Sequence, residues 1–136
     1  MTFATMNTDG GARGNPGQAA IGIILKDEKG EKIKSKGHYL GIGTNNEAEY
    51  MALLMGLELA LELDIQKLEC RLDSELVVKQ LNGAYKVKMP KLRALYDRVK
   101  LLSQKFANIQ YVHVHREQNS EADKIVNEVL DNVSQI

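Results

Sequence analysis

Tryptophan is absent from the sequence of 136 residues, aromatic residues make up only 5%, and Cys70 is the single cysteine. One cysteine excludes an internal disulfide framework and a zinc cluster built on several thiolates, and a reducing compartment is the simplest setting. No apolar run reaches the roughly 18 residues that a membrane span requires. Residues 1–6 lack the basic and then apolar layout of a signal peptide. We therefore expect a cytoplasmic protein with no membrane association.

Aliphatic residues must supply the core, because aromatic residues are scarce. Hydrophobic residues make up 43% of the chain, which is enough for a packed interior and is not typical of a disordered chain. A length of 136 residues suits one hydrophobic core. We expect residues 1–136 to form a single domain that is a monomer.

The net charge is zero, but the charges are segregated along the chain. Residues 79–105 contain eight basic residues and one acidic residue, whereas residues 47–75 contain eight acidic and two basic residues. The simplest interpretation of the basic segment is a solvated helix face. Beside an acidic pocket, the same segment becomes a candidate platform for a phosphate backbone.

The apolar pattern changes partway along the chain from strands to alternating helices and strands. The first part is typical of three strands joined by short turns, with a glycine-rich turn at residues 10–17. The predicted strands are 1–9, 19–27, 31–40, 67–73 and 108–115, and the predicted helices are 45–63, 74–82, 91–106 and 120–133. The order βββαβααβα predicts an α/β (α+β) fold with a mixed five-stranded sheet and helices on both faces.

Four acidic residues fall beside predicted strand ends or helix starts. Asp9 and Asp73 end the first and fourth predicted strands, and Glu49 and Asp123 lie in the first turns of two helices. Ligand crevices in such sheets open at the carboxyl ends of strands. Clustered carboxylates repel one another unless a cation is bound or some stay protonated. Hard oxygen ligands of this kind suit Mg²⁺ or Mn²⁺.

Each acid also has a purely structural interpretation. Acidic residues near helix N-termini stabilise the helix dipole, and Asp73 can simply start a helix. The patterns Thr44-x-x-Glu47 and Ser120-x-x-Asp123 are both typical of capping boxes. Taken singly, none of the four acids identifies an active site.

Helix geometry distinguishes Glu49 from the nearby Glu47. At 100° per residue, the two side chains lie about 200° apart around the helix. Glu49 shares its side with the small or apolar residues Ala52, Leu53, Gly56 and Ala60, which suits packing on a sheet. Glu47 shares its side with Met51, Glu58 and Glu62, a mostly solvated face, so we predict that Glu49 is the acid aimed inward.

Four segments together resemble the ribonuclease H type 1 family over nearly the whole chain. The segments are Thr8-Asp9-Gly10-Gly11-Ala12-Arg13-Gly14-Asn15-Pro16-Gly17, Thr44-Asn45-Asn46-Glu47-Ala48-Glu49-Tyr50, Asp73-Ser74-Glu75-Leu76-Val77 and His115-Arg116-Glu117-Gln118-Asn119-Ser120-Glu121-Ala122-Asp123. Any one segment is a weak signal, but four in order at family-like spacing are a strong one. The resemblance implies the ribonuclease H-like fold, in line with the element order above.

The resemblance also implies an endoribonuclease that hydrolyses the RNA strand of RNA–DNA hybrids with two Mg²⁺ ions, for which Mn²⁺ can substitute. Carried over by position, Asp9 would contact both ions, Glu49 and Asp73 would complete one site, and Asp123 the other. Such two-metal hydrolysis leaves 5′-phosphate and 3′-hydroxyl ends. The alternatives are a hybrid-binding module with weak or lost catalysis, and another metal-dependent nuclease on the same scaffold.

The resemblance further implies substrate contacts. The loop that starts at Gly14 would approach the minor groove, and Asn15 and Asn45 match positions that sense 2′-hydroxyl groups, since an amide both donates and accepts. Thr44 and Asn46 match positions near the phosphates of the DNA strand. A turn residue at Asn15 and a helix cap at Asn45 are the structural alternatives.

The chain departs from the family pattern in two places. A long basic protrusion containing tryptophan is missing, and Lys86 and Lys88 are the candidates for a smaller basic ridge. For the mobile histidine of the family, His115 is the candidate and Arg116 the alternative, while we interpret His113 as structural.

Overall fold

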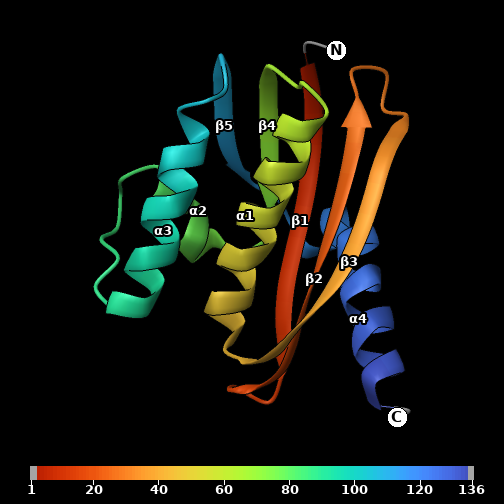
Figure 1. Ribbon diagram of the computed structural model, residues 1–136, viewed down its shortest axis with the longest axis vertical. Helices are drawn as coiled ribbons and strands as arrows, with labels where there is room; N and C mark the ends of the chain where they lie inside the picture. Colours follow the sequence, from red (N-terminus) through yellow and green to blue (C-terminus); the bar gives the residue numbers. More distant parts are fainter. Residues whose placement is uncertain (1–2, 135–136) are drawn as a thin grey trace.

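The computed structural model describes residues 3–134, which form one five-stranded sheet flanked by helices (Figure 1). The strand order is β3-β2-β1-β4-β5. β1, β2 and β3 pair antiparallel, whereas β4 pairs parallel with both β1 and β5. The elements are β1 (Phe3–Arg13), β2 (Gly17–Asp27), β3 (Lys32–Gly43), α1 (Asn45–Glu62), β4 (Lys67–Leu72), α2 (Glu75–Leu81), α3 (Pro90–Ser103), β5 (Asn108–His113), a 3₁₀ turn (Arg116–Asn119) and α4 (Ser120–Ser134). The predicted element order and mixed sheet are confirmed.

Helices cover both faces of the sheet, as the sequence predicts. Figure 1 shows α1 in front of the sheet with α2 and α3 beside it, and α4 behind β2 and β3. Glycines lie where α1 and α4 contact the sheet. A Cβ atom on Gly10 would lie 2.2 Å from the Ala48 carbonyl of α1, and one on Gly22 would lie 2.4 Å from the Ala122 oxygen of α4. The two helices therefore approach the sheet more closely than any residue with a side chain would allow.

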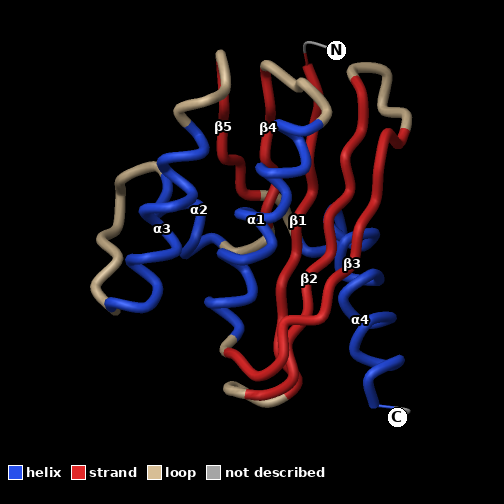
Figure 2. The backbone as a smooth tube through the Cα atoms, viewed as in Figure 1, coloured by secondary structure: helices blue, strands red, loops and turns tan. Residues whose placement is uncertain are grey.

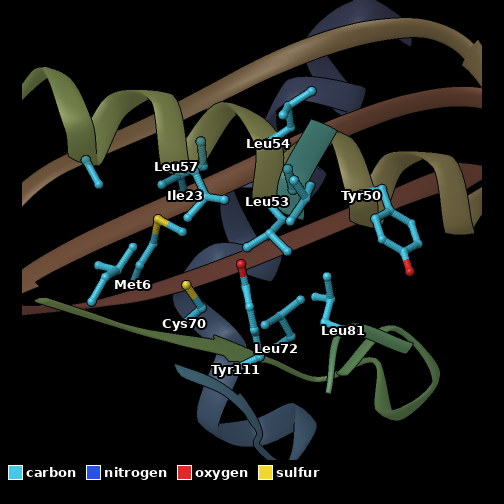
Figure 3. Close-up of a cluster of buried hydrophobic side chains, with 14 of the residues drawn as sticks. Met6, Ile23, Tyr50, Leu53, Leu54, Leu57, Cys70, Leu72, Leu81 and Tyr111 are labelled. Atoms are coloured by element: carbon cyan, nitrogen blue, oxygen red, sulfur yellow. The ribbon is translucent and has the colours of Figure 1, made fainter. Parts of the chain in front are cut away.

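Aliphatic side chains and a few tyrosines fill the main core, between the sheet and α1, α2 and α3 (Figure 3). Met6 of β1, Ile23 of β2 and Leu53 and Leu57 of α1 are fully buried there. The thiol of Cys70 is also buried, and burial raises its pKa. A smaller cluster under α4 consists of Ala20, Val126 and Leu130, with Val129 packed against it.

The first strand is longer than predicted, and the glycine-rich turn is correspondingly shorter. β1 does not end at Asp9 but continues through Arg13, and Figure 2 shows the strand running on to the turn before β2. The register with β2 explains this, because backbone pairing extends from Ala4↔Asp27 to Arg13↔Gln18. Tertiary pairing thus overrides the low strand propensity of glycine. Residues 1–2 of the predicted first strand lie outside the described residues.

The two predicted capping boxes have different outcomes. At Thr44 the box is confirmed, since Oγ1 accepts from the Glu47 N–H at 3.1 Å and Glu47 Oε1 accepts from the Thr44 N–H at 3.0 Å. At Ser120 it is wrong, because a 3₁₀ turn precedes α4 and Ser120 already has helical angles of φ −63° and ψ −33°. The capping explanation of Glu47 stands, and that of Asp123 falls.

Within residues 3–134, none of the helices combines the length and the apolar character that crossing a membrane would require.

Replacing Gly10 should destabilise the fold strongly. Gly10→Ala places a Cβ atom 2.2 Å from main-chain atoms of Ala48, which cannot move away as a flexible side chain would. We expect the free energy of unfolding in urea to fall by about 3 kcal/mol. Gly11→Ala is the matched control, because its nearest neighbours lie 3.9 Å and 4.0 Å away, and we expect a change below about 0.5 kcal/mol. Equal losses in both variants would contradict the close approach of α1.

Candidate active site

The register of the sheet brings Asp9 and Asp73 together. β1 and β4 pair in parallel from Phe3↔Lys67 to Asn7↔Arg71. Asp9 and Asp73 each lie two residues beyond the last pair, where β4 has ended at Leu72 and β1 continues. A crevice therefore opens beside β1 at the carboxyl end of β4, as expected for such sheets. Both side chains belong to this crevice.

Glu49 reaches the same place from α1. The close approach at Gly10 lets the Gly10 N–H donate to Glu49 Oε1 at 2.8 Å, and the Glu49 side chain is buried. Glu47 lies apart, in an ion pair of 2.8 Å with Lys91 of α3. The predicted inward orientation of Glu49 is confirmed.

Carboxylate oxygens of Asp9, Glu49 and Asp73 lie within 4.8 Å of one another. Asp123 of α4 lines the same cavity, which has a volume of about 470 Å³. Its other lining residues are Gly10, Gly11, Ala12, Arg13, Asn45, Asn46, Ser74, Arg116, Val126, Asn127 and Leu130. The structure thus gathers the four predicted acids in one cavity, with three in close contact and Asp123 beside them.

Crowding and burial favour the protonated forms of these acids. Burial, followed by the charge of Asp73, raises the pKa of Asp9 to about 7. Burial, followed by the charge of Asp9, raises the pKa of Glu49 well above its ordinary value. Burial also raises the pKa of Asp73, although hydrogen bonding from Asn119 and the charge of Arg116 act to lower it. A positive charge at the cluster would therefore stabilise the ionised forms of these acids.

The residues fit a divalent cation. Glu49 Oε2 is buried and has no hydrogen-bond partner among the described residues, while Oε1 is already held by the Gly10 N–H. Buried polar atoms are almost always satisfied, so this oxygen points to a missing positive partner. Carboxylate oxygens are the ligands that hard divalent ions prefer. The triad of Asp9, Glu49 and Asp73 can therefore bind a metal ion.

Asn119 supports the site from beside the cavity without lining it, and the sequence reasoning missed this role. It is almost fully buried, its Nδ2 donates to the Thr8 carbonyl at 2.9 Å, and its Oδ1 accepts from Asn7 Nδ2 at 3.0 Å. Asn119 thus pairs with the Thr8 carbonyl just beyond the last β1–β4 pair, and hydrogen bonding from Asn119 acts to lower the pKa of Asp73. No local sequence pattern shows that this strand edge needs a partner, so the signal is purely tertiary.

The predicted substrate contacts lie around the turn after β1 and the start of α1. Asn45 Oδ1 accepts from the Ala12 N–H at 2.8 Å, and the Asn45 N–H donates to Asn15 Oδ1 at 3.0 Å. Thr44 is the N-cap of α1, so the alternative of a helix cap at Asn45 is wrong. These bonds tie the turn to the helix and hold Asn45 at the cavity.

The remaining predicted residues lie outside the cavity lining. Gly14 belongs to the turn between β1 and β2, and Lys86 and Lys88 are exposed residues of the segment between α2 and α3. His115 is exposed and does not line the cavity, whereas its neighbour Arg116 does. The placement favours the arginine alternative, and a role for His115 stays a prediction.

Comparison with known proteins agrees with this geometry. Residues 7–129 match the family described as reverse transcriptase-like. Ribonuclease HI of Halobacterium salinarum is 42% identical over 123 residues, which is 90% of this chain and 62% of that protein. The bifunctional protein Rv2228c of Mycobacterium tuberculosis is 39% identical over 96% of this chain and 36% of its own length. This chain therefore spans only part of these curated relatives.

Solved structures are also similar. The crystal structure of the Halobacterium salinarum RNase H1 has a TM-score of 0.94 at 40% identity and covers 96% of this chain and 98% of that chain. The LC11-RNase H1 structure in complex with an RNA/DNA hybrid has a TM-score of 0.90 at 42% identity, covering 96% and 98%. With its fold, acid cluster and sequence in agreement, the chain belongs to the ribonuclease H type 1 family.

Without metal, the stability of the protein should depend on pH. The folded state holds a proton on Asp9 with a pKa of about 7, against an ordinary value of 3.8. Since folding then binds protons, the free energy of unfolding should fall as pH rises from about 4 to 7. Thermal unfolding with a chelator at constant ionic strength measures this. Asp9→Asn should flatten the slope, and added Mg²⁺ should stabilise the protein more at pH 8 than at pH 5. If the stability of the unmodified protein and of Asp9→Asn depended on pH in the same way, the raised pKa of Asp9 would be contradicted.

Proposed function

We propose that this chain is a ribonuclease H that hydrolyses the RNA strand of RNA–DNA hybrids, leaving 5′-phosphate and 3′-hydroxyl ends. The observation that carries the proposal is the triad of buried Asp9, buried Glu49 and partly buried Asp73, with carboxylate oxygens within 4.8 Å of one another and one Glu49 oxygen unsatisfied. The complex of LC11-RNase H1 with an RNA/DNA hybrid supports the choice of substrate.

In this proposal the four acids hold two divalent cations, with Mg²⁺ as the preferred ion and Mn²⁺ as a substitute. Asp9, Glu49 and Asp73 suit one ion, and Asp9 with Asp123 suits the other. When bound, such ions activate water and stabilise the leaving oxygen of a phosphodiester. The Gly10 N–H fixes Glu49 through one oxygen and leaves the other for coordination.

Positive and amide groups of the cavity would orient the hybrid. Arg116 lines the cavity on the Asp73 side and suits the scissile phosphate. Asn45 uses its oxygen on the Ala12 N–H, which leaves its NH₂ group for a 2′-hydroxyl, the group that distinguishes RNA from DNA. Lys86 and Lys88, which lie farther along the chain in the basic segment, would attract the phosphate backbone through their positive charge.

Removing an acid should abolish cleavage. With labelled RNA–DNA hybrid, double-stranded RNA and double-stranded DNA in Mg²⁺ or Mn²⁺, we expect the protein to cut only the RNA strand of the hybrid. Asp9→Asn and Asp73→Asn should each lower the rate by about 10³-fold, or about 4 kcal/mol of transition-state stabilisation.

Asp64→Asn is the matched control for these variants, because Asp64 is exposed and follows α1 at a positive φ of 58° that asparagine tolerates. It should cleave at the normal rate. Equal cutting of duplex DNA would indicate another nuclease activity, and hybrid binding without cleavage would indicate a binding module.

Asn45→Asp tests the proposed 2′-hydroxyl contact without removing the structural one. The new carboxylate can still accept from the Ala12 N–H but no longer donates. We expect the KM for hybrid to rise about tenfold, the value of one hydrogen bond of about 1.4 kcal/mol, with little change in unfolding free energy. Asn132→Asp, on an exposed part of α4, is the control. An unchanged KM for Asn45→Asp would remove Asn45 from the contact surface.

A further inference from the structure

Asp123 is held differently from the other three acids. It lies outside the triad whose oxygens approach within 4.8 Å, its side chain is only partly buried, and it comes from the opposite face of the sheet. Like charge from Asp9 and Asp73 repels it. Something other than packing must therefore keep its carboxylate directed at the cavity.

Asn127, one helical turn after Asp123, provides that contact. Its Nδ2 donates to Asp123 Oδ2 at 3.3 Å. The other end of the amide faces Arg13 at the end of β1, whose Nη2 lies 3.5 Å from Asn127 Oδ1 and 3.4 Å from the Asn127 carbonyl oxygen. An amide placed between a guanidinium and a carboxylate has one favourable orientation, with oxygen toward the cation and NH₂ toward the anion. Arg13 thus selects the orientation that supports Asp123.

Asp131, one further turn along α4, fixes Arg13. Its Oδ1 lies 2.7 Å from Arg13 Nη2. Four residues of strand separate Asp9 from Arg13, or about 13 Å, and eight residues of helix separate Asp123 from Asp131, or about 12 Å. These stretches of β1 and α4 lie against each other, since a Cβ atom on Gly11 would lie 3.9 Å from the Val126 side chain. Matching lengths put an acid pair at one end and an ion pair at the other, with Asn127 between them.

We propose that Asn127 is a positioning residue for Asp123, and that Arg13 acts through Asn127 by fixing the orientation of its amide. This inference rests on the proposed function, because it assigns Asp123 a task at the metal site. Arg13 and Asp131 are both exposed, so their ion pair by itself contributes little to stability. The ion pair instead fixes the position of Arg13 and so the orientation of the Asn127 amide.

Asn127→Ala should weaken metal binding and turnover together. In the free protein, calorimetry with Mn²⁺ alone should show affinity reduced by about tenfold, the lower end for loss of a group that orients a metal ligand. With hybrid substrate, kcat should fall by a similar factor while KM stays unchanged. Asn132→Ala is the matched control on the same helix, exposed and away from the cavity, and should match the unmodified protein in both measurements.

A double-mutant cycle tests the order of action. Arg13→Gln should reduce Mn²⁺ affinity and kcat about threefold on its own and cause no further loss in an Asn127→Ala background, because contacting residues are not additive. Additive losses in the two variants would show that Arg13 acts independently of Asn127, and an increase in KM with Arg13→Gln would show direct substrate binding by Arg13. Either result would overturn its proposed action through Asn127. Asn127→Ala behaving like Asn132→Ala would overturn the role of Asn127. Failure of the unmodified protein to bind Mn²⁺ or cleave hybrid would instead reject the proposed function.

Discussion

The close approach of α1 and α4 to the sheet beside Asp9 is the constraint on which the rest of this site depends. Gly10 follows Asp9 along β1, and Gly22 is the β2 partner of Asp9. A Cβ atom at either glycine would lie within 2.4 Å of main-chain atoms of α1 or α4. Because both helices reach the sheet at this position, Glu49 arrives from one face and Asp123 from the other. The site lies where main-chain atoms of both helices approach the sheet.

Crowding the acids opposes folding, and the scaffold must hold them against their repulsion. Burial and neighbouring charge raise the pKa values of Asp9, Glu49 and Asp73, which is the sign of a cluster that a cation would relieve. The supporting contacts come from neutral groups: the Gly10 N–H donates to Glu49, and the Asn119 amide acts to lower the pKa of Asp73. Neutral donors orient carboxylates without cancelling their charge, so the carboxylates can still bind a cation.

The chain separates acidic and basic residues along its sequence, and the fold then sets how they meet. Glu49 of α1 and Asp73, which follows β4, meet at the cavity, while most of the basic segment forms α3 and the loop before it. The Lys91–Glu47 ion pair, at 2.8 Å, joins the start of α3 to the start of α1, the helix that carries Glu49. A neutral net charge therefore conceals an acidic cavity at one place in the fold and a separate concentration of basic residues along α3.

The sequence by itself determined the element order, the capping box at Thr44, the inward direction of Glu49 and the choice of the four acids that meet at one cavity, because these follow from local periodicity and from motifs. Only the tertiary structure decided that β1 runs through Asp9 to Arg13, since β2 supplies the pairing. It also decided that Ser120 is not a cap and that Arg116, not His115, lines the cavity. The contacts of Asn119 with Thr8 and of Arg13 with Asn127 join residues more than a hundred positions apart. Such contacts depend on strand register and helix docking, which no local pattern encodes.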